Sequence, residues 1–158
     1  MSSLLSIEVF NNLHDLLHVF RARMRKTMEA SHPELTFNEM RILLRTGLHP
    51  GMTQRDLVEH SHIDKAQMAR MLANLQDKGW LKRSTSESDK RVRCLHLSEQ
   101  GQHLFAQLRD LQEQVATELL QDCPSPAQAQ LLALLQQARS SADAHAGIVM
   151  AHSLVKSV

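Results

Sequence analysis

The chain has 158 residues, of which 42% are hydrophobic but only 3% aromatic, and tyrosine is absent. This length suits one domain, and a core built from Leu, Met, Val, Ile and Ala favours packed helices over a sandwich of sheets. The formal net charge of +1 conceals an asymmetry, since residues 1–98 carry 15 basic and 11 acidic side chains and residues 99–158 carry 3 and 6. The excess positive charge in the first part suits a polyanionic partner.

Several classes of protein are excluded by what the sequence lacks. It has no nucleophile elbow, phosphate-binding loop, dinucleotide fingerprint or H-E-x-x-H motif, so an enzyme is not expected. Cys94 and Cys123 have neither the spacing of a metal site nor that of a disulfide framework. The start of the chain does not read as a secretory signal, and no run of ~18 apolar residues predicts a membrane span. A soluble cytoplasmic protein without a membrane partner is therefore expected.

Two amphipathic helices are predicted at the start. Apolar side chains recur at three- and four-residue steps in residues 7–29, and the dipeptide His32 and Pro33 ends this helix. Residues 36–45 form the second helix, where Thr36 and Glu39 have the spacing of a capping box. A turn at residues 47–51 follows.

A pair of short helices comes after the turn. The first covers residues 53–60, with Thr53 as its N-cap. The second covers residues 64–78, with Asp64 as its N-cap and Gly79 placed for a left-handed C-cap. Its apolar residues fall on one helical stripe, which consists of Met68, Met71, Leu72 and Leu75.

A basic hairpin follows directly. Residues 80–84 and 91–97 are candidate strands, and residues 85–90 form a polar loop between them. Five of the seven charged side chains in residues 80–97 are basic. A helix pair followed by such a hairpin, or wing, is the arrangement of a winged-helix DNA reader, in which one helix reads base edges and the wing reaches phosphates or the minor groove.

Two longer helices complete the chain. Ser98 is the expected N-cap of a helix that runs to about residue 122. After a break at residues 124–126, Ser125 as N-cap and Pro126 at the first helical position open a last helix over residues 127–144. The tail, residues 147–158, is expected to be weakly helical at best.

In a helix-turn-helix the second helix lies in the major groove, and here that helix is residues 64–78. With its apolar stripe buried, the outward residues near its start are Lys65, Ala66, Gln67, Ala69 and Arg70. The amide of Gln67 can pair with adenine, while Lys65 or Arg70 can bind guanine or phosphate. The alternative is an ordinary surface helix with solvated charges, and the hairpin behind it favours the DNA-reading role.

These motifs together resemble the MarR family (multiple-antibiotic-resistance regulators). The matching segments are L-T-F-N-E-M-R-I-L-L, T-Q-R-D-L, I-D-K-A-Q-M-A-R-M-L and D-K-R-V-R-C-L-H-L-S-E-Q-G. Within them, Asp89 and Arg91 match the D-x-R signature of the wing, and residues 97–101 match the L-T/S-x-x-G start of a long helix. The resemblance extends over residues 7–144.

The resemblance implies a single domain over residues 1–158, mainly α with a small β-hairpin wing. Residues 36–97 would be a winged helix-turn-helix DNA-binding lobe, and residues 1–32 and 98–146 a helical dimerisation region. A homodimer through the first, fifth and sixth helices would bind a pseudo-palindromic operator in double-stranded DNA. The near-heptad apolar residues of the fifth helix, which lack a partner within one lobe, independently favour a dimer.

The resemblance also suggests roles in the wing. Arg91 would enter the minor groove, and Asp89 would pair with an arginine to orient the wing or, alternatively, act as a turn former. Lys90 and Arg93 would contact phosphate or be solvated, and Arg83 would pair with Asp89 or contact phosphate. Ala69 stands where relatives commonly have Ser or Thr, so one hydroxyl contact to DNA is absent.

Effector binding is the commoner behaviour of this family. A small aromatic or anionic molecule would bind between the dimerisation region and the lobe, and no cofactor or metal is predicted. The candidate wall residues, each of which can also be read as simple core, are His14, Leu17, His18 and Met40.

Other readings of the same fold remain. His14 and His18 have i, i+4 spacing that can chelate a metal, but no Cys or Glu cluster completes the site. A redox sensor would need a reactive thiol, and burial without function is the better reading of both cysteines. A winged helix that contacts only proteins has no need of so basic a wing. A ligand-responsive repressor is the reading that the sequence favours.

Overall fold

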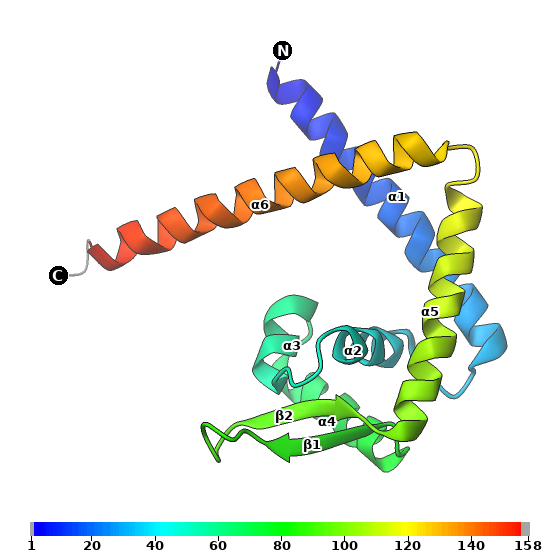
Figure 1. The fold of residues 1–158 in the computed structure, drawn as a ribbon, viewed down its shortest axis with the longest axis vertical. Coiled ribbons are helices and arrows are strands. Elements are labelled where there is room, and N and C mark those ends of the chain that lie inside the picture. Colours follow the sequence, from blue (N-terminus) through cyan, green and yellow to red (C-terminus); the bar gives the residue numbers. More distant parts are fainter. Residues whose placement is uncertain (1, 156–158) are drawn as a thin grey trace. The chain divides into compact units, whose positions relative to one another are not determined.

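The computed structural model describes the backbone of residues 2–155 and the side chains of residues 4–146 (Figure 1). These residues fall into two compact units, which divide after Ala116. The first unit contains α1 (Ser2–Ser31), α2 (Phe37–Leu48), α3 (Gln54–Ser61), α4 (Lys65–Asp77), β1 (Leu81–Thr85), β2 (Arg93–Leu97) and most of α5 (Glu99–Leu119). The second unit contains the end of α5 and the whole of α6 (Ser125–Val155). The predicted fold class, mainly helical with a small hairpin, is confirmed.

The predicted caps at the helix starts are present. Thr36 Oγ1 accepts a hydrogen bond from the Glu39 amide (3.2 Å), and the Glu39 carboxylate accepts one from the Thr36 amide (3.0 Å). Asp64 accepts from the Gln67 amide (2.8 Å), and Ser98 Oγ accepts from the Gly101 amide (3.0 Å). Each cap satisfies amides that a helix leaves unpaired at its first turn, so the elements begin where these residues stand.

The cap of α3 is stronger than the sequence analysis predicted. Besides the expected bond from the Asp56 amide to Thr53 Oγ1 (3.1 Å), the Asp56 carboxylate accepts from the Thr53 amide (2.8 Å), which completes a second capping box. This backbone hydrogen bond, together with the bond to the Thr53 side chain, lowers the pKa of Asp56 because it favours the ionised carboxylate.

The first unit packs around a core of leucine and methionine. Leu43, Met68, Leu72, Leu75, and Leu108 are completely buried. The predicted stripe of α4 therefore faces inward as expected. The two strands pair in antiparallel register from Leu81 opposite Leu97 to Thr85 opposite Arg93. Among residues 2–155, every helix is either too short or too polar to span a bilayer.

Several expected boundaries were wrong. α1 begins at Ser2 instead of residue 7, and β2 begins at Arg93 instead of residue 91, so Arg91 lies in the turn of the hairpin. α5 ends at Leu119, before the expected residue 122. These differences follow from fraying and turn geometry, which periodicity alone does not resolve.

The prediction for the last helix was also wrong in two respects. The helix begins at Ser125 itself, so Ser125 is inside the helix and is not its N-cap. The Gln128 side chain donates hydrogen bonds back to the carbonyls of Cys123 (2.8 Å) and Leu120 (3.3 Å) in the connection before the helix. The helix also continues to Val155, through the tail expected to be weakly helical. Alanines at 142, 144, 146 and 151 have high helix propensity, no proline follows Pro126, and a single glycine costs only ~1 kcal/mol.

Much of the apolar stripe of α1 is not buried. Met24 and Met28 are 1% exposed, whereas Phe10 is 72% and Leu5 64% exposed. The end of α1 thus packs in the core, whereas its first turns carry an exposed apolar face. Exposed apolar faces of this kind mark interaction sites.

Gly101 marks a close approach between α5 and the strand entrance. A Cβ at this position would lie 2.0 Å from the Trp80 carbonyl oxygen and 2.9 Å from its carbon. The same carbonyl accepts from the Ser98 amide (3.0 Å), so neither backbone can withdraw without losing this bond. The glycine of the L-S-E-Q-G segment is therefore required by packing.

We predict that Gly101→Ala lowers the free energy of unfolding by about 1–3 kcal/mol, the usual cost of an overpacked site. In a helix with open space around the glycine, the same change would raise the free energy of unfolding by up to ~1 kcal/mol through helix propensity. The sign of the change therefore shows whether packing requires a glycine at position 101. Urea unfolding monitored by the fluorescence of Trp80 measures the change. Gln102→Ala, at the exposed next position, is the control and should change stability by less than ~0.5 kcal/mol.

Candidate nucleic-acid interface

A tight turn joins α3 to α4. His62 adopts a left-handed conformation there (φ 57°), which ends α3, and Ile63 is buried beneath the turn. The Ile63 amide donates to Ser61 Oγ (3.3 Å), and Asp64 then caps α4. The turn is thereby held from both sides, and the start of α4 has a fixed direction.

The start of α4 presents its polar residues outward. Lys65, Ala66 and Arg70 are exposed, and Gln67 and Ala69 are partly exposed. In the part of the chain that the structure describes, no carboxylate forms an ion pair with Lys65 or Arg70. This face is therefore short, positively charged and unobstructed by its own side chains, as a surface that approaches phosphates and base edges requires.

A compact turn forms the wing tip. Asp89 Oδ1 accepts from the Arg91 amide (2.9 Å), the Asp89 carbonyl accepts from the Val92 amide (3.0 Å), and the Val92 carbonyl accepts from the Ser86 amide (2.9 Å). Asp89 thus forms this turn, and no ion pair between Asp89 and an arginine occurs among the described residues. Lys90, Arg91 and Arg93 are exposed around it.

Arg83 lies in the body of the wing. It pairs with Leu95 in the strand register, and its Nε is buried without a hydrogen-bond partner. No ion pair joins Arg83 to Asp89 in the described residues, so the structure does not show the pairing that was one of the two expected roles of Arg83.

The wing is anchored by a third extended segment that the sequence analysis missed. The Leu95 amide donates to the Met52 carbonyl (2.8 Å), and the Gly51 amide donates to the Leu95 carbonyl (3.0 Å). Thr53 forms a β-bridge with Cys94 directly before α3 begins. Only the turn at Pro50 and Gly51 hinted at this pairing, and two residues are too few for a periodic pattern. The segment links the wing to the start of the helix pair.

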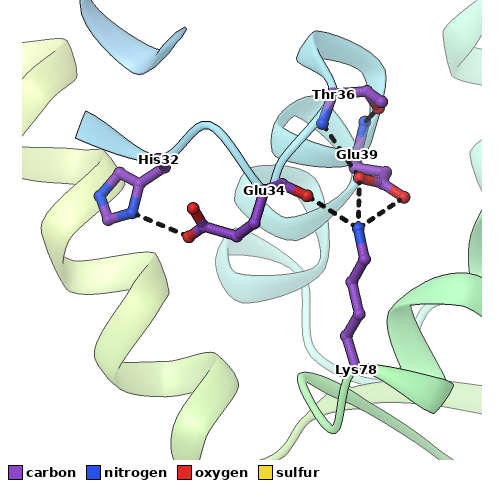
Figure 2. A network of polar contacts seen from close by, with 5 residues as sticks. All are labelled: His32, Glu34, Thr36, Glu39 and Lys78. Carbon is purple, nitrogen blue, oxygen red and sulfur yellow. Dashed lines mark hydrogen bonds and ion pairs between the residues drawn. The ribbon is translucent and has the colours of Figure 1, made fainter. Parts of the chain in front are cut away.

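A second missed feature is an ion pair with one buried partner, which Figure 2 shows. Lys78 Nζ lies 3.1 Å from one carboxylate oxygen of Glu39 and 3.3 Å from the other, and it donates to the Glu34 carbonyl (2.9 Å). The Glu39 side chain is only 4% exposed, whereas that of Lys78 is 36% exposed. The capping pattern identified Glu39, but nothing in the spacing linked it to a lysine 39 residues later.

The surroundings extend this network at both ends. Lys78 Nζ also lies 5.4 Å from the centre of the Trp80 ring, which is a cation–π contact. The Glu34 carboxylate lies 3.3 Å from His32 Nδ1, within hydrogen-bond distance. The end of α4 is thereby tied to the start of α2 and to the connection between α1 and α2. This network orients the helix whose other end faces outward.

The residues suggested for an effector pocket are only partly brought together. Leu17 and Met40 line one cavity of about 150 Å³ between α1, α2 and α5, together with Arg21, Met24 and Arg41 among others. His14 and His18 are exposed on α1 and do not line it. No cluster of three or more His, Cys, Asp or Glu that could hold a metal ion occurs in the described residues. Cys94 and Cys123 are partly buried free thiols.

Parts of the chain are similar to a known family and to known regulators. The MarR family model matches residues 35–92. The transcriptional regulator HosA of Escherichia coli O157:H7 is 27% identical over 113 residues, which are 72% of this chain and 81% of that protein. Among solved structures, the crystal structure of MarR has a TM-score of 0.71 at 23% identity over 85% of this chain and 93% of that one. The structure of Streptococcus pneumoniae FabT in complex with DNA has a TM-score of 0.68 at 17% identity over 87% and 97% of the two chains.

We predict that Lys78→Met lowers the free energy of unfolding by about 1–3 kcal/mol, because it leaves the buried carboxylate of Glu39 without its cation. Adding Glu39→Gln should restore part of this loss, which a double-mutant cycle by urea unfolding with far-UV circular dichroism would measure. Arg55→Met removes the exposed ion pair with Glu59 (2.9 Å) and should cost at most ~1 kcal/mol. Equal losses of unfolding free energy in Lys78→Met and Arg55→Met would contradict a structural role for the pair of Lys78 and Glu39. Strict additivity in the double-mutant cycle would contradict it as well.

Proposed function

We propose that the chain is a member of the MarR family and a transcriptional regulator, not an enzyme, that binds a pseudo-palindromic operator as a homodimer. The observation that carries the proposal is the combination of two basic surfaces in one unit: the exposed start of α4 and the exposed wing tip. Neither surface is needed for the core, and in the described residues no ion pair joins a basic side chain of either surface to a carboxylate. FabT, which shares the fold, is seen in complex with DNA.

The start of α4 would read the major groove. Gln67 can form two hydrogen bonds with adenine, and Lys65 or Arg70 can bind guanine or a phosphate. Ala66 and Ala69 are small enough to let the helix approach the bases closely, and Ala69 offers no hydroxyl to them. Specificity would therefore rest on few side chains.

The wing would add contacts outside the major groove. Arg91 stands at the turn that Asp89 holds, and it would enter a narrow minor groove, where the negative potential favours a guanidinium. Lys90, Arg93 and Arg83 would contact phosphates. Asp89 would orient the wing through the turn.

A dimer would account for the exposed apolar residues of α1 and α6. On α1 these are Leu4, Leu5, Ile7, Val9, Phe10, Leu16, Leu17 and Val19, and on α6 they are Leu131, Leu132, Leu134 and Leu135. Faces of this kind mark interfaces. Residues 1–32 and 98–146 would form the dimerisation region, and two lobes of residues 36–97 would bind half-sites one DNA turn apart, ~34 Å.

The proposal includes regulation by a small aromatic or anionic effector, with the protein acting as a repressor in the cytoplasm. The cavity that Leu17 and Met40 share also contains Arg21 and Arg41 but no acidic side chain. Burial lowers the pKa of Arg41, and the positive charge of Arg21 lowers it further, so an anion there would relieve the repulsion between two guanidinium groups. Effector binding of this kind couples to DNA affinity by ~1–3 kcal/mol.

We predict that Arg91→Ala weakens binding to the operator by about tenfold or more while the dimer persists. Fluorescence anisotropy with the DNA upstream of the protein's own gene and with random DNA, at two salt concentrations, measures the affinity, and light scattering measures the dimer. Arg109→Ala removes an equal charge from the exposed side of α5 and should leave the affinity nearly unchanged.

A second variant separates base reading from general attraction. Gln67→Ala should reduce the preference for operator over random DNA more than it reduces binding to random DNA. Equal losses on both DNAs would remove Gln67 from base recognition, and an unchanged affinity of Arg91→Ala would remove the wing from the mechanism. The proposed function itself would be overturned if lowering the salt concentration did not tighten the binding of the wild-type protein to either DNA.

We predict that hydroxylated benzoic acids release the operator DNA, and that Arg21→Gln raises the acid concentration for half release by about tenfold because one charge of the cavity is lost. The same anisotropy assay provides the measurement, with the affinity for DNA in the absence of acid as the internal control. Release at equal concentrations in both proteins would argue against this cavity as the effector site.

A further inference from the structure

Two histidines of α1 are left without a role by the fold and by the proposed function. His14 and His18 are exposed, and they do not line the cavity between α1, α2 and α5. Among residues 4–146, neither imidazole takes part in a hydrogen bond or an ion pair. The rings of His60 and His145, in contrast, are each bonded to a backbone carbonyl one turn earlier (2.7 and 2.6 Å). The ring nitrogens of His14 and His18 are therefore available to a ligand.

The spacing of this pair allows both imidazoles to reach one ion. α1 is helical from Ser2 to Ser31, and residues four apart in a helix lie on the same face with about 5–6 Å between their Cβ atoms. Both rings can then meet at a metal ion about 2.0–2.1 Å from one nitrogen of each. Two histidines at this spacing supply the zinc ligands of helical metal motifs. Of the ten histidines in the chain, no other two are three or four residues apart.

The ligands determine which ions the pair would prefer. Imidazole nitrogens suit Zn²⁺, Ni²⁺ and Cu²⁺, whereas Mg²⁺ and Ca²⁺ take oxygen ligands. Because the described part of the chain has no cluster of three or more His, Cys, Asp or Glu, the protein would supply two imidazoles and water would fill the other positions. Of the charged residues within one turn of the pair, Asp15 attracts a cation and Arg21 repels one. The pair is therefore suited to an open site on the surface of α1.

We propose that His14 and His18 bind one divalent transition-metal ion, represented by Zn²⁺, and that the bound ion clamps this turn of α1. In an α-helix the amide of residue 18 donates to the carbonyl of residue 14, so the ion and this hydrogen bond close the same turn. In an extended chain the two residues would lie about 13 Å apart, too far for both rings to share an ion. Binding therefore stabilises the helical form of this segment against its unfolded form.

The clamp would act where α1 has little packing of its own. Met24 and Met28 bury the end of the helix, whereas Leu5, Phe10 and Leu16 are exposed. Most helices in proteins are stabilised by tertiary packing, so the first half of α1 depends more on other contributions. A bound ion would supply one of these and would stabilise the exposed apolar face that the proposed function assigns to the dimer. Only this last consequence rests on the proposed function.

Nuclear magnetic resonance of the histidine side chains tests the site directly. With 15N-labelled histidine, Zn²⁺ added to the DNA-free protein should shift the ring nitrogens of His14 and His18, and Mg²⁺ at the same concentration should shift neither. Zn²⁺ should also slow the hydrogen exchange of the amides at residues 15–18, because the clamp opposes opening of this turn. Calorimetry should show that His18→Gln weakens Zn²⁺ binding by at least about tenfold, since the loss of a group that merely orients a metal ligand already costs ~10–100-fold in affinity.

Two variants serve as matched controls. His103→Gln removes one exposed histidine from α5 and should bind Zn²⁺ as the wild type does. His18→Gln combined with Leu16→His keeps ten histidines but places two of them at residues 14 and 16, on different faces of the helix. This double variant should bind Zn²⁺ as weakly as His18→Gln alone. All the altered side chains are outside the core, so the fold of each variant should persist.

The proposal would be contradicted if Zn²⁺ shifted the ring nitrogens of neither His14 nor His18. Wild-type affinity in the double variant would show that the helical spacing does not create the site. Equal losses of affinity in His18→Gln and His103→Gln would show that surface histidines bind the ion without a defined site. None of these measurements requires DNA, so a failure of operator binding in the anisotropy assay is recognised separately.

Discussion

The ion pair between Glu39 and Lys78 is the contact on which the orientation of α4 and of the wing depends. Glu39 caps α2 and also holds the lysine that ends α4, so one nearly buried carboxylate defines both helix ends. Removing a carboxylate from water is costly unless it is paired, and this cost makes other orientations of α4 unfavourable. The pair therefore contributes orientation more than net stability, since two well-packed apolar side chains could supply the latter.

The residues after Lys78 transmit this orientation to the wing and to α5. Gly79 turns the chain with a positive φ of 78°, its carbonyl accepts a hydrogen bond from the Ser98 hydroxyl, and the Trp80 carbonyl accepts one from the Ser98 amide. The ends of both strands and the start of α5 are thus fixed within a few residues of the end of α4. With the base of the hairpin held in this way and β2 bonded to Met52, the tip is free of any role in the core. The basic residues of the tip are therefore not needed for folding of the core and remain available for contacts with another molecule.

The sequence predicted most of the local structure because local structure depends on neighbours. Thr36, Thr53, Asp64 and Ser98 each act on amides two or three residues away, so their caps could be read from spacing. The pairing of Lys78 with Glu39 and the bonding of Met52 to β2 join residues distant in sequence, and no period reports them. The prediction for the tail was wrong for another reason. A single glycine, Gly147, costs a helix only ~1 kcal/mol, and no proline lies in residues 147–155, so nothing in this stretch ends α6.

The cations of α2 show which features folding does not explain. Buried arginines normally have their donors satisfied, and the lobe could be closed by apolar residues at these positions without the cost of desolvating a guanidinium. Instead Arg41 borders two cavities, and Arg45 keeps a buried nitrogen without a partner. Repulsion between Arg41 and Arg21, which contributes to the lowered pKa of Arg41, adds to this cost. Packing of the lobe offsets neither cost, so stability alone does not explain why α2 carries these two cations.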